Sequence, residues 1–417
     1  MNILFLTDYW FPQMTANTIC VQNIAEELQR TCNKVHVCAY SEGQQTPDTV
    51  EDIRFSYIRP SFARRLLQQS KHCNNKSLAR LLALAGTTIN RIRRLILLPF
   101  YPVVSFSVPR RWSKKVSEIV QKDKIDVVVS VIAPDEALYA GYLIKKNNPS
   151  IDWKVYYIDA GTNILTDTSF EGLKKALQNK AKKWENKMLK LASKVVVMEG
   201  HADYYRHTLS SENAKKLRIG NVPLLKIGTV SAPAQTISKN DKEKWVYTGN
   251  LSGLFYDPKP LCEFFIQYRK KHLNAELHLY GPSDHREYLE SVGKIQCGIF
   301  WHGPVNHDEI PMILSSADLL VYFNCRQLDS VSGKFFEYLG YGKRILYYGS
   351  QGDINSNQIR KYNSGLVVDM NDPMEDNLRK TEEFLLKHHD SDTVDVEYLK
   401  AAFTLNLPET TAKFILS

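Results

Sequence analysis

The sequence predicts an α/β protein with two Rossmann-like domains. Apolar, strand-like runs alternate with helical patterns in both halves of the chain, which is typical of parallel sheets covered on both faces. A chain of 417 residues is too long for one comfortable core and fits two domains of about 200 residues each. The stretch 226–240 is rich in Ser, Thr, Pro and Ala and poor in large apolar residues, so we interpret it as an interdomain linker.

The first domain is expected to span 1–225. Its strand-like runs are 2–9, 34–40, 54–58, 126–133, 153–159 and 194–199. Between the first two runs, Ile19, Ile24 and Leu28 follow helical spacing within 17–30. The Lys-rich pattern 171–191 predicts a long helix at the surface.

The second domain is expected to span 241–395. Its strand-like runs begin at Trp245 and continue at 277–281, 299–305, 319–323, 345–348 and 364–369. Helical patterns occupy 333–339, 373–387 and 394–405. We expect a separate C-terminal helical segment at 396–417.

The net charge of +9 comes from one segment. Residues 53–117 contain no Asp or Glu but fourteen Lys and Arg, and removing those fourteen leaves 40 basic against 45 acidic residues. We therefore expect a basic insertion near 60–115 in an otherwise mildly acidic protein.

Part of this insertion predicts an amphipathic helix. On a helical wheel with 100° per residue, a stripe of aliphatic side chains lies opposite the cations Lys76, Arg80, Arg91 and Arg94. The stripe contains Leu78, Leu81, Leu82, Ala85, Ile89, Ile92 and Ile96. Such a helix suits an anionic membrane surface, while packing on the protein's own sheet is the alternative. The next apolar run, 95–108, is too short to span a bilayer. Nucleic-acid binders usually interleave aromatic residues with their cations, so the stripe favours lipid over nucleic acid.

The cysteines and the N-terminus bear on metal binding, disulfide bonds and location. The seven cysteines form an odd, scattered set without a C-x-x-C pair, which argues against a disulfide framework and against a zinc site. No signal peptide is apparent, because the first short apolar run already contains Asp8. We expect a cytoplasmic protein that is peripheral at the inner face of the membrane.

The stretch 318–349 contains the candidate site. It has an apolar run, a polar loop, a helical segment and a second apolar run. The loop and the first helical turn contain Asp329, Ser332, Gly333, Lys334 and Glu337. Loops at the carboxyl ends of parallel strands are where α/β proteins bind anionic ligands, and this group of donors, acceptors and one cation suits a phosphorylated sugar.

These residues also resemble a known family. Asp329 and Glu337, separated by seven residues, resemble the E-x7-E signature of retaining glycosyltransferases of the GT-B fold, family 4 in particular, with Asp in place of the first Glu. The run S-G-K-F-F-E-Y-L-G-Y-G-K is similar to a variant seen in enzymes that build bacterial surface polysaccharides.

Three further turns resemble the same family. Thr248-Gly249-Asn250 resembles its G-R-L or G-N-L turn, where Gly lets the backbone approach the donor phosphates. Asn250 stands at the usual Arg position, so Lys259 is the nearest replacement cation, or else a solvated residue at a helix start. The runs ending at Gly281 and Val305 resemble the later strand ends, L-x-G and F-x-G-x-V.

The resemblance implies roles for these residues. It implies two Rossmann-like domains facing across a cleft, with a final helix that often crosses back to the first domain. Glu337 would accept hydrogen bonds from the donor ribose, and Val305 would contact the base. Lys334, the amides of Ser332 and Gly333, and Lys259 would neutralise the diphosphate, with Gly249, Asn250 and Gly281 beside it. Asp329 would orient or stabilise the donor sugar.

Asp159 ends a strand in the first domain, where family members often have an acidic or His residue near the acceptor. It would be a general base or an acceptor-orienting group, or else a residue that only caps the following loop.

The predicted function is that of a retaining, hexosyltransferase-like enzyme acting in cell-surface polysaccharide synthesis. Its donor would be a nucleotide sugar and its acceptor a lipid-linked saccharide. No D-x-D follows a strand near the site, so we expect activity without a metal or other cofactor. The alternatives are a GT-B nucleotide-sugar epimerase and a non-catalytic protein of the same fold that binds membranes or nucleic acid.

Overall fold

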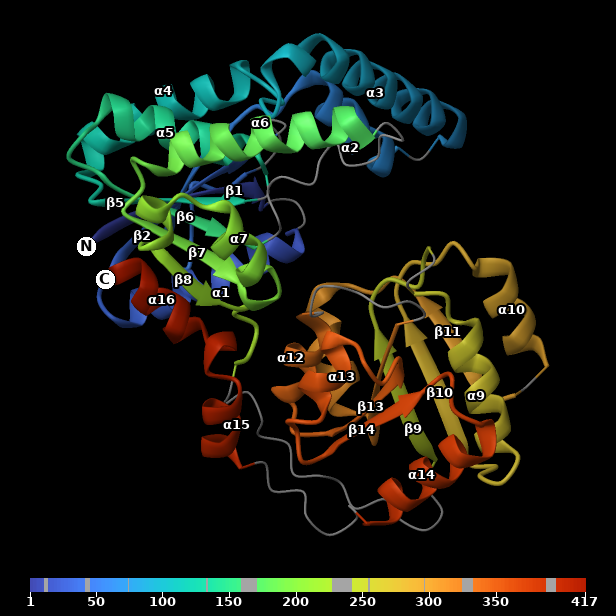
Figure 1. Cartoon of the computed structure of the whole chain (residues 1–417). Coiled ribbons are helices and arrows are strands. Elements are labelled where there is room, and N and C mark those ends of the chain that lie inside the picture. The colour runs from blue at the N-terminus through green and yellow to red at the C-terminus, as the bar shows by residue number, and fades with distance from the viewer. Residues whose placement is uncertain are drawn as a thin grey trace. The chain divides into compact units, whose positions relative to one another are not determined.

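The computed structural model describes residues 1–10, 14–41, 46–73, 75–132, 134–158, 171–226, 242–253, 256–295, 297–324, 333–387 and 395–417. The chain divides into two compact units, Met1–Pro223 with Leu405–Ser417, and Leu224–Thr404. Each unit has its own sheet with helices on both sides (Figure 1). The α/β architecture with two sheets that the sequence predicts is confirmed.

The first unit is built on an eight-stranded sheet with the order β3-β4-β2-β1-β5-β6-β7-β8. Its strands are β1 (Asn2–Tyr9), β2 (Lys34–Tyr40), β3 (Thr49–Val50), β4 (Ile53–Ile58), β5 (Val127–Ile132), β6 (Asp152–Tyr157), β7 (Lys194–Met198) and β8 (Leu217–Gly220). The short β3 is antiparallel to β4, and the other neighbouring pairs are parallel. The chain order reverses between β1 and β5, so their carboxyl ends form a topological switch point.

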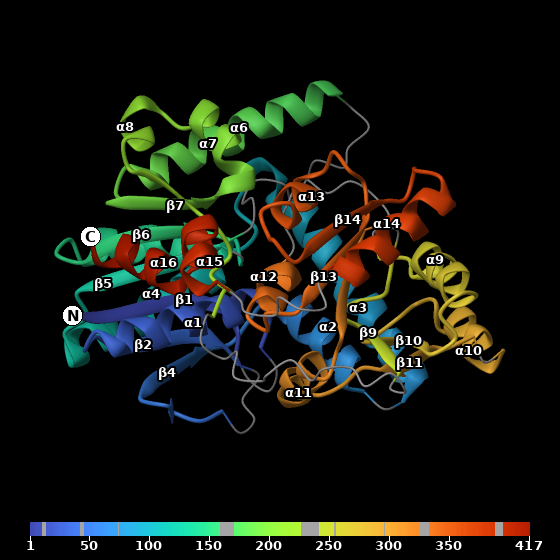
Figure 2. The ribbon, with the colours of Figure 1, turned by 90° about the horizontal axis from the view of Figure 1, so that it is seen from below.

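Helices cover both faces of this sheet, with α4 and α5 on one face and α1 and α16 on the other (Figures 1 and 2). The helices of the unit are α1 (Ala16–Arg30), α2 (Phe62–His72), α3 (Lys76–Leu97), η1 (Leu98–Phe100), α4 (Ser107–Asp123), α5 (Glu136–Asn147), α6 (Glu171–Leu189), η3 (Glu199–His201), α7 (Ala202–Thr208), α8 (Ser211–Ala214) and α16 (Pro408–Leu416). Thr15, Ser61 and Asn75 cap α1, α2 and α3 by accepting hydrogen bonds from first-turn amides.

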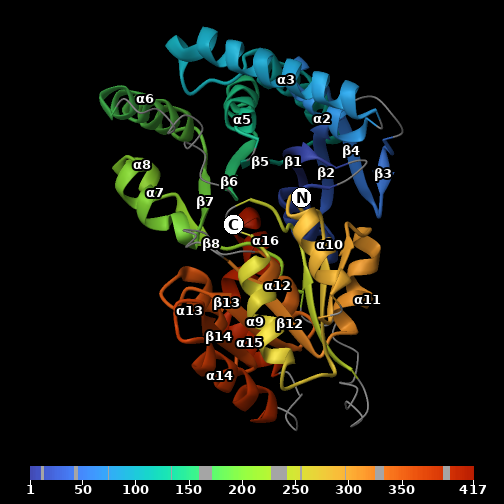
Figure 3. The same ribbon diagram turned by 90° about the vertical axis from the view of Figure 1, so that its right-hand side faces the viewer.

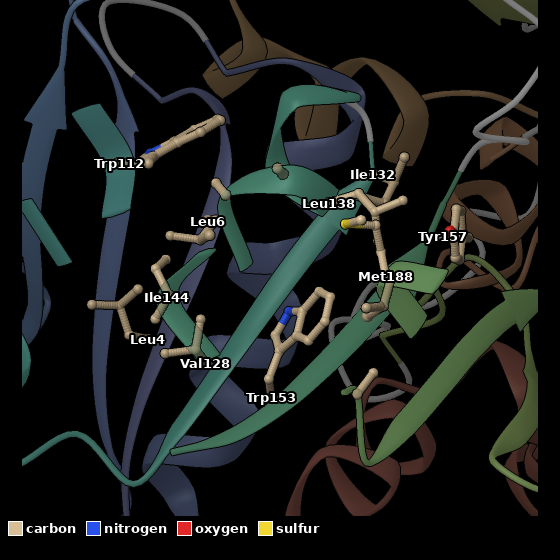
Figure 4. Close-up of a cluster of buried hydrophobic side chains, with 14 of the residues drawn as sticks. Leu4, Leu6, Trp112, Val128, Ile132, Leu138, Ile144, Trp153, Tyr157 and Met188 are labelled. Carbon is tan, nitrogen blue, oxygen red and sulfur yellow. The ribbon is translucent and has the colours of Figure 1, made fainter. Parts of the chain in front are cut away.

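The core of the first unit lies between β1, β5 and β6 and the helices α4 and α5 (Figure 4). All six residues of β5 are buried, as a strand inside a parallel sheet covered on both faces requires. Ser130 is the one polar side chain in β5, and its hydroxyl accepts a hydrogen bond from Trp153 Nε1 at 3.0 Å. Gly141 of α5 lies against this pair, because a Cβ there would be 2.2 Å from both Ser130 Oγ and Trp153 Nε1.

The last helix of the chain, α16, belongs to the first unit. The buried ammonium of Lys154 in β6 donates to the carbonyl of Ile415 at 2.6 Å, and Lys194 in β7 donates to the Ser417 hydroxyl at 2.5 Å. The chain leaves the first unit after Pro223 and returns to it at Leu405, close to the same place. There the amide of Asn221 donates to the Leu405 carbonyl at 3.1 Å. The segment η5 (Thr404–Asn406) lies at this return.

The basic segment forms a helical hairpin of α2 and α3 (Figures 1 and 3). Gly86 of α3 is buried, and a Cβ there would be 2.9 Å from Leu67 Cγ of α2, so the two helices approach closely at this glycine. The aliphatic stripe that the sequence predicts is divided by this packing. Leu82, Ala85 and Ile89 are half-buried, whereas Leu78, Leu81, Ile92 and Ile96 are exposed. No helix in the described stretches is both long and apolar enough to cross a membrane.

The second unit has a six-stranded parallel sheet with the order β11-β10-β9-β12-β13-β14. Its strands are β9 (Glu243–Thr248), β10 (Ala275–Tyr280), β11 (Ile299–Gly303), β12 (Leu319–Phe323), β13 (Arg344–Gly349) and β14 (Gly365–Asp369). Its helices are α9 (Lys259–Arg269), α10 (Arg286–Lys294), η4 (His307–Glu309), α11 (Ile310–Ser315), α12 (Gly333–Leu339), α13 (Ile354–Ile359), α14 (Met374–Lys387) and α15 (Val396–Ala402). The chain order reverses between β9 and β12, which puts the switch point of this unit at their carboxyl ends.

The packing at Gly141 predicts that Gly141→Ala destabilises the first unit. The new methyl group would overlap the Trp153 indole, and overpacking of this kind costs about 1–3 kcal/mol, more than the gain from replacing a helical glycine. The free energy of unfolding in urea measures the effect. Gly172→Ala in α6 is the matched control, since a Cβ at that position would have nothing within 4 Å and its effect should stay within about 0.5 kcal/mol. Equal stability of the two variants would contradict the packing described for α5.

Candidate functional site in the second unit

The candidate site lies at the switch point of the second sheet. β9 ends at Thr248 and β12 ends at Phe323, and the turn after β9 contains Gly249. α12 begins at Gly333 after the loop that follows β12, so its first turn returns to this edge. The hydroxyl of Tyr338 in α12 accepts a hydrogen bond from the Thr248 amide at 2.9 Å and thereby fixes the helix against the end of β9.

Two glycines allow the strand ends to touch. Gly249 has φ of +143° and Gly281, after β10, has φ of +137°. The Gly249 amide donates to the Tyr280 carbonyl at 2.8 Å, and the Gly281 amide donates to the Gly303 carbonyl at 2.7 Å. A Cβ on Gly281 would lie 1.8 Å from the carbonyl oxygen of Gly249, so a larger residue would separate the two turns.

The missing side chain of Gly249 makes room for Lys334. A Cβ at position 249 would lie 2.0 Å from Lys334 Cε, so the lysine stem crosses the glycine turn. Its ammonium Nζ lies 4.4 Å from the ring centroid of Tyr256 and 5.5 Å from that of Tyr247, within the range of cation–π contacts. The structure thus brings Lys334, Gly249 and Gly281 together at one point of the sheet edge.

The electrostatics of Lys334 follow from this enclosure. Burial lowers the pKa of Lys334 to about 8, and the carboxylate of Glu337, three residues further along α12, opposes that shift. Since a buried ammonium is more stable beside a second negative charge, the position favours an anionic ligand. Among the described residues, no group of three or more His, Cys, Asp or Glu side chains could hold a metal ion.

The remaining predicted residues lie as follows. Asn250 is exposed, and its carbonyl accepts a hydrogen bond from the Tyr247 hydroxyl at 2.8 Å. Lys259 is exposed at the start of α9, where its Nζ lies 5.5 Å from the ring of Tyr288. Val305 is half-buried just after β11. No described contact joins these three side chains to Lys334. Asp329, Ser332 and Asp159 lie outside the described residues.

The aromatic rings beside Lys334 and the tyrosine that holds α12 were not predicted from the sequence. Tyr247 could have been found, because residues two apart in a strand face the same side and Tyr247 stands two before Gly249. Tyr338 had no such signal, because its burial and its hydrogen bond from the Thr248 amide are known only from the structure. Tyr256 belongs to a loop, where no periodicity applies.

The first unit has a second polar cluster, at the carboxyl ends of β5 and β6. Glu185 of α6 is only 2% exposed and accepts a hydrogen bond from the Tyr157 hydroxyl at 2.5 Å. Burial raises the pKa of Glu185 to about 7. The adjoining cavity is small, about 30 Å³, and is lined mainly by aromatic and apolar side chains with Asp135 and Glu136. Glu185 lies on the buried face of the Lys-rich helix that we expected at the surface, and most of the other described residues of α6 are exposed or half-buried, as expected.

Comparison with known proteins finds similarity of structure alone. No protein-family model matches the chain, and no curated protein matches it significantly in sequence. Solved structures match it over its full length. WaaG, a glycosyltransferase involved in lipopolysaccharide biosynthesis, is 12% identical, and the match covers 100% of this chain and 99% of WaaG at a TM-score of 0.54.

Two further matches were solved with ligands. A variant of S. aureus TarM in complex with Fondaparinux, alpha-GlcNAc-glycerol and UDP is 9% identical, with 100% and 99% of the two chains covered and a TM-score of 0.59. UDP-GlcNAc 2-epimerase from Neisseria meningitidis, bound to UDP-GlcNAc, is 13% identical, with 100% and 98% covered and a TM-score of 0.55. At these identities the likeness concerns the fold. The chain has the GT-B fold of two Rossmann-like domains, as the sequence resemblance implied.

The environment of Lys334 predicts an amine that loses its proton at an unusually low pH. With its pKa lowered to about 8 by burial, the neutral amine becomes the major form above that pH. Acetylation followed residue by residue with mass spectrometry should therefore show half-maximal labelling of Lys334 near pH 8, against about 10.4 for an ordinary lysine.

The sign of this effect can be checked with Glu337→Gln. The Glu337 carboxylate raises the pKa of Lys334, so its removal should move half-maximal labelling to lower pH. A midpoint near pH 10 in the unmodified protein, or an upward shift in the variant, would contradict the site described.

Proposed function

We propose that the protein is a retaining glycosyltransferase that moves a sugar from a nucleotide-sugar donor to a lipid-linked saccharide acceptor. The single observation that carries the proposal is Lys334, held across the Gly249 turn at the switch point of the second sheet. A nucleotide diphosphate is the anionic ligand that this edge of an α/β sheet suits. The GT-B fold supports the same class of ligand.

The chemistry assigned to the site is the departure of a nucleoside diphosphate. The bond between the anomeric carbon and the diphosphate oxygen breaks, and an acceptor hydroxyl attacks on the same face while its proton passes to the departing phosphate or to a base such as Asp159. Lys334 stabilises the negative charge that develops on the leaving group, and Lys259 and the Ser332–Gly333 amides assist it. Glu337 accepts hydrogen bonds from the ribose, Asp329 orients the donor sugar, Val305 contacts the base, and Asn250 lies beside the diphosphate.

We propose that this reaction needs no divalent cation, because a preorganised ammonium supplies the positive charge that a metal supplies elsewhere. Turnover that is unchanged in EDTA would support this, and turnover that EDTA abolishes and Mg²⁺ restores would contradict it.

A nucleotide-sugar epimerase is the second candidate, since an epimerase is among the structures that share this fold. It would bind the same donor but needs no acceptor. Product analysis distinguishes the two: an epimerase changes the sugar of the nucleotide sugar in the absence of any acceptor, whereas a transferase releases nucleoside diphosphate in proportion to glycosylated acceptor. Binding of the donor without either reaction would identify a non-catalytic protein of the same fold.

The α3 surface supports a role at a membrane. Leu81, Leu84, Leu95 and Ile96 are 63%, 67%, 70% and 67% exposed. Lys76, Arg80, Arg91 and Arg94 are exposed along one flank of the same helix. Because α3 already uses its Gly86 face against α2, the outer leucines have no partner among the described residues. Apolar residues flanked by cations suit the interface of an anionic bilayer, so we propose a peripheral protein of the cytoplasmic face that acts in surface-polysaccharide synthesis.

The proposed donor site predicts different losses in two variants, of nucleotide-sugar binding in one and of turnover in the other. UDP-sugars are the first probes, because two of the matching structures were solved with UDP or UDP-GlcNAc. Glu337→Ala should abolish thermal stabilisation by the nucleotide sugar because the ribose loses its acceptor. Lys334→Ala should reduce turnover by a factor equivalent to about 2–4 kcal/mol of transition-state stabilisation. Lys270→Ala, at the exposed end of α9, is the control that should leave both unchanged. Near-normal binding and turnover in the first two variants would remove the assignment.

The exposed stripe predicts a variant that loses membrane binding without losing stability. Leu84→Gln with Leu95→Gln should weaken co-sedimentation with phosphatidylglycerol-containing vesicles by at least about tenfold, since burying each leucine in the interface contributes roughly 1.5–3 kcal/mol. Its melting temperature should be unchanged because both side chains are exposed. The control is Leu386→Gln, a 78% exposed leucine in α14. Equal vesicle binding by the parent protein, the double variant and the control would show that α3 is not the membrane-contacting surface.

A further inference from the structure

Four arginines gather at the base of the α2–α3 hairpin, near the carboxyl ends of β1, β2 and β4. They are Arg64 and Arg65 of α2, Arg93 of α3 and Arg111 of α4, and we refer to them as the arginine cluster. Arg111 Nη2 donates to the carbonyl of Pro60, one residue before the cap of α2, at 3.4 Å. The Arg64 guanidinium lies 5.0 Å from the ring centroid of Tyr40, at the end of β2.

The cluster contains buried donors that the described residues do not use. Nη1 of Arg64 and Nε of Arg65, Arg93 and Arg111 are buried and have no hydrogen-bond partner among the described residues. The hydroxyl of Tyr40, a residue that is 0% exposed, is in the same condition. An unsatisfied buried donor costs roughly 1–3 kcal/mol, and native structures tolerate few of them. Arg64 Nη1 has an ion pair with Asp8 but no hydrogen bond, and the other four donors have neither, so we infer that a ligand with several acceptor oxygens binds in this region.

The charge balance of the cluster indicates the charge of the ligand. The carboxylates that act on these arginines are Asp8, whose Oδ1 lies 3.6 Å from Arg64 Nη1, and Glu136, which is buried. Four guanidinium groups against two carboxylates leave two positive charges. Burial lowers the pKa of Arg93 and that of Arg111, and neighbouring arginines lower both further. A ligand with two negative charges would relieve this repulsion.

The geometry of arginine suits both carboxylate and phosphate oxygens, and the excess of two positive charges favours phosphate, since one phosphate group can carry two negative charges. Guanidinium groups bind phosphate oxygens with paired, charge-assisted hydrogen bonds, and arginine is preferred over lysine where such planar recognition is needed. The same hairpin presents exposed Ile92 and Leu95 on either side of Arg93 in the sequence, on the outer face of α3. One helix therefore offers an apolar surface outward and the half-buried guanidinium of Arg93 inward.

We propose that the arginine cluster binds the phosphate or diphosphate through which the saccharide acceptor is joined to its lipid. The proposal rests on the function proposed above and names how the acceptor is recognised. The lipid chain remains in the bilayer against the outer face of α3, while the anionic linkage enters the hairpin base and meets Arg64, Arg93 and Arg111. Recognition of the linkage would be independent of which sugar it carries.

The test uses inorganic pyrophosphate and full-length protein carrying Lys334→Ala, which removes the cation of the donor site. Arg93→Gln with Arg111→Gln should weaken pyrophosphate binding, measured by calorimetry at low salt, at least tenfold. Arg80→Gln with Arg91→Gln, two exposed arginines of α3, changes the net charge equally and should weaken it less than twofold. No binding in the Lys334→Ala background, or an equal loss in both double variants, would overturn the proposal.

Stability without ligand separates a binding role from a structural one. Each guanidinium group makes one hydrogen bond, from Arg93 to Asn90 Oδ1 and from Arg111 to the Pro60 carbonyl, and each has a buried, unsatisfied Nε. The loss and the gain oppose each other, so the neutral replacements should melt close to the temperature of the parent. A merely structural pair would melt lower. If the double variant does not fold, Arg93→Lys serves instead, since it keeps the charge and loses paired hydrogen bonding; it should still weaken pyrophosphate binding several-fold, and unchanged binding would overturn the proposal.

The source of the phosphate is distinguished with vesicles. Phosphatidylcholine vesicles containing an alkyl diphosphate are compared with vesicles of equal charge containing phosphatidylglycerol. Preference for the diphosphate, lost in Arg93→Gln with Arg111→Gln, supports the proposal. Equal binding to both vesicles would assign the cluster to ordinary headgroups and overturn acceptor recognition. Thermal stabilisation of the same variant by a nucleotide sugar reports on the donor site separately, so failure of the proposed function and failure of this inference are distinguishable.

Discussion

The contact between the turns at Gly249 and Gly281 is the constraint on which the edge of the second sheet depends. Each turn uses space that a Cβ would fill: the carbonyl of Gly249 lies where the Cβ of residue 281 would be, and the stem of Lys334 lies where the Cβ of residue 249 would be. Two strand ends and one helix thereby meet at a single point. The lowered pKa of Lys334 is a consequence of this close packing, because the same contact that positions the ammonium also removes water from it.

The first unit uses positive charge in a different way. Its cations occur on a hairpin whose two helices meet at Gly86, and the remaining surface of α3 is divided between exposed leucines and inward-facing Arg93. The excess of positive charge in this segment therefore forms two features in space, an exposed flank of cations and a group of half-buried arginines. A membrane-facing role and a phosphate-binding role are compatible because they use opposite sides of the hairpin.

Much of the fold could be predicted from the sequence. Buried parallel strands are continuous apolar runs, so β12 was predicted with the bounds that the structure has, and α12 likewise, since Gly333–Leu339 carries a clear helical pattern. The orientation of α3 could not be predicted in the same way. A helical wheel counts hydrophobic side chains and gives Gly86 no weight, yet close approach at that glycine determines which face meets α2.

Site residues could be predicted where they stand at the end of a strand or helix, and not where only folding brings them together. Gly249, Gly281 and Lys334 stand at strand or helix ends, and the structure brings them together. The four arginines come from three helices and are joined only by folding, so the sequence showed their charge but not their meeting. Glu185 shares helical spacing with the buried positions Ala181, Met188 and Leu189, but the lysines between them concealed that stripe.

The return of α16 has a consequence for how the protein is made. Lys154 and Lys194 lie on the neighbouring strands β6 and β7 of the first sheet. The groups to which they donate, the Ile415 carbonyl and the Ser417 hydroxyl, follow the whole second unit in the sequence. During synthesis the second unit emerges from the ribosome before these partners exist. Until then Lys154 has the carboxylate of Asp152, 3.2 Å from its Nζ, but not the Ile415 carbonyl, so the first unit can be completed only after the whole second unit has been made.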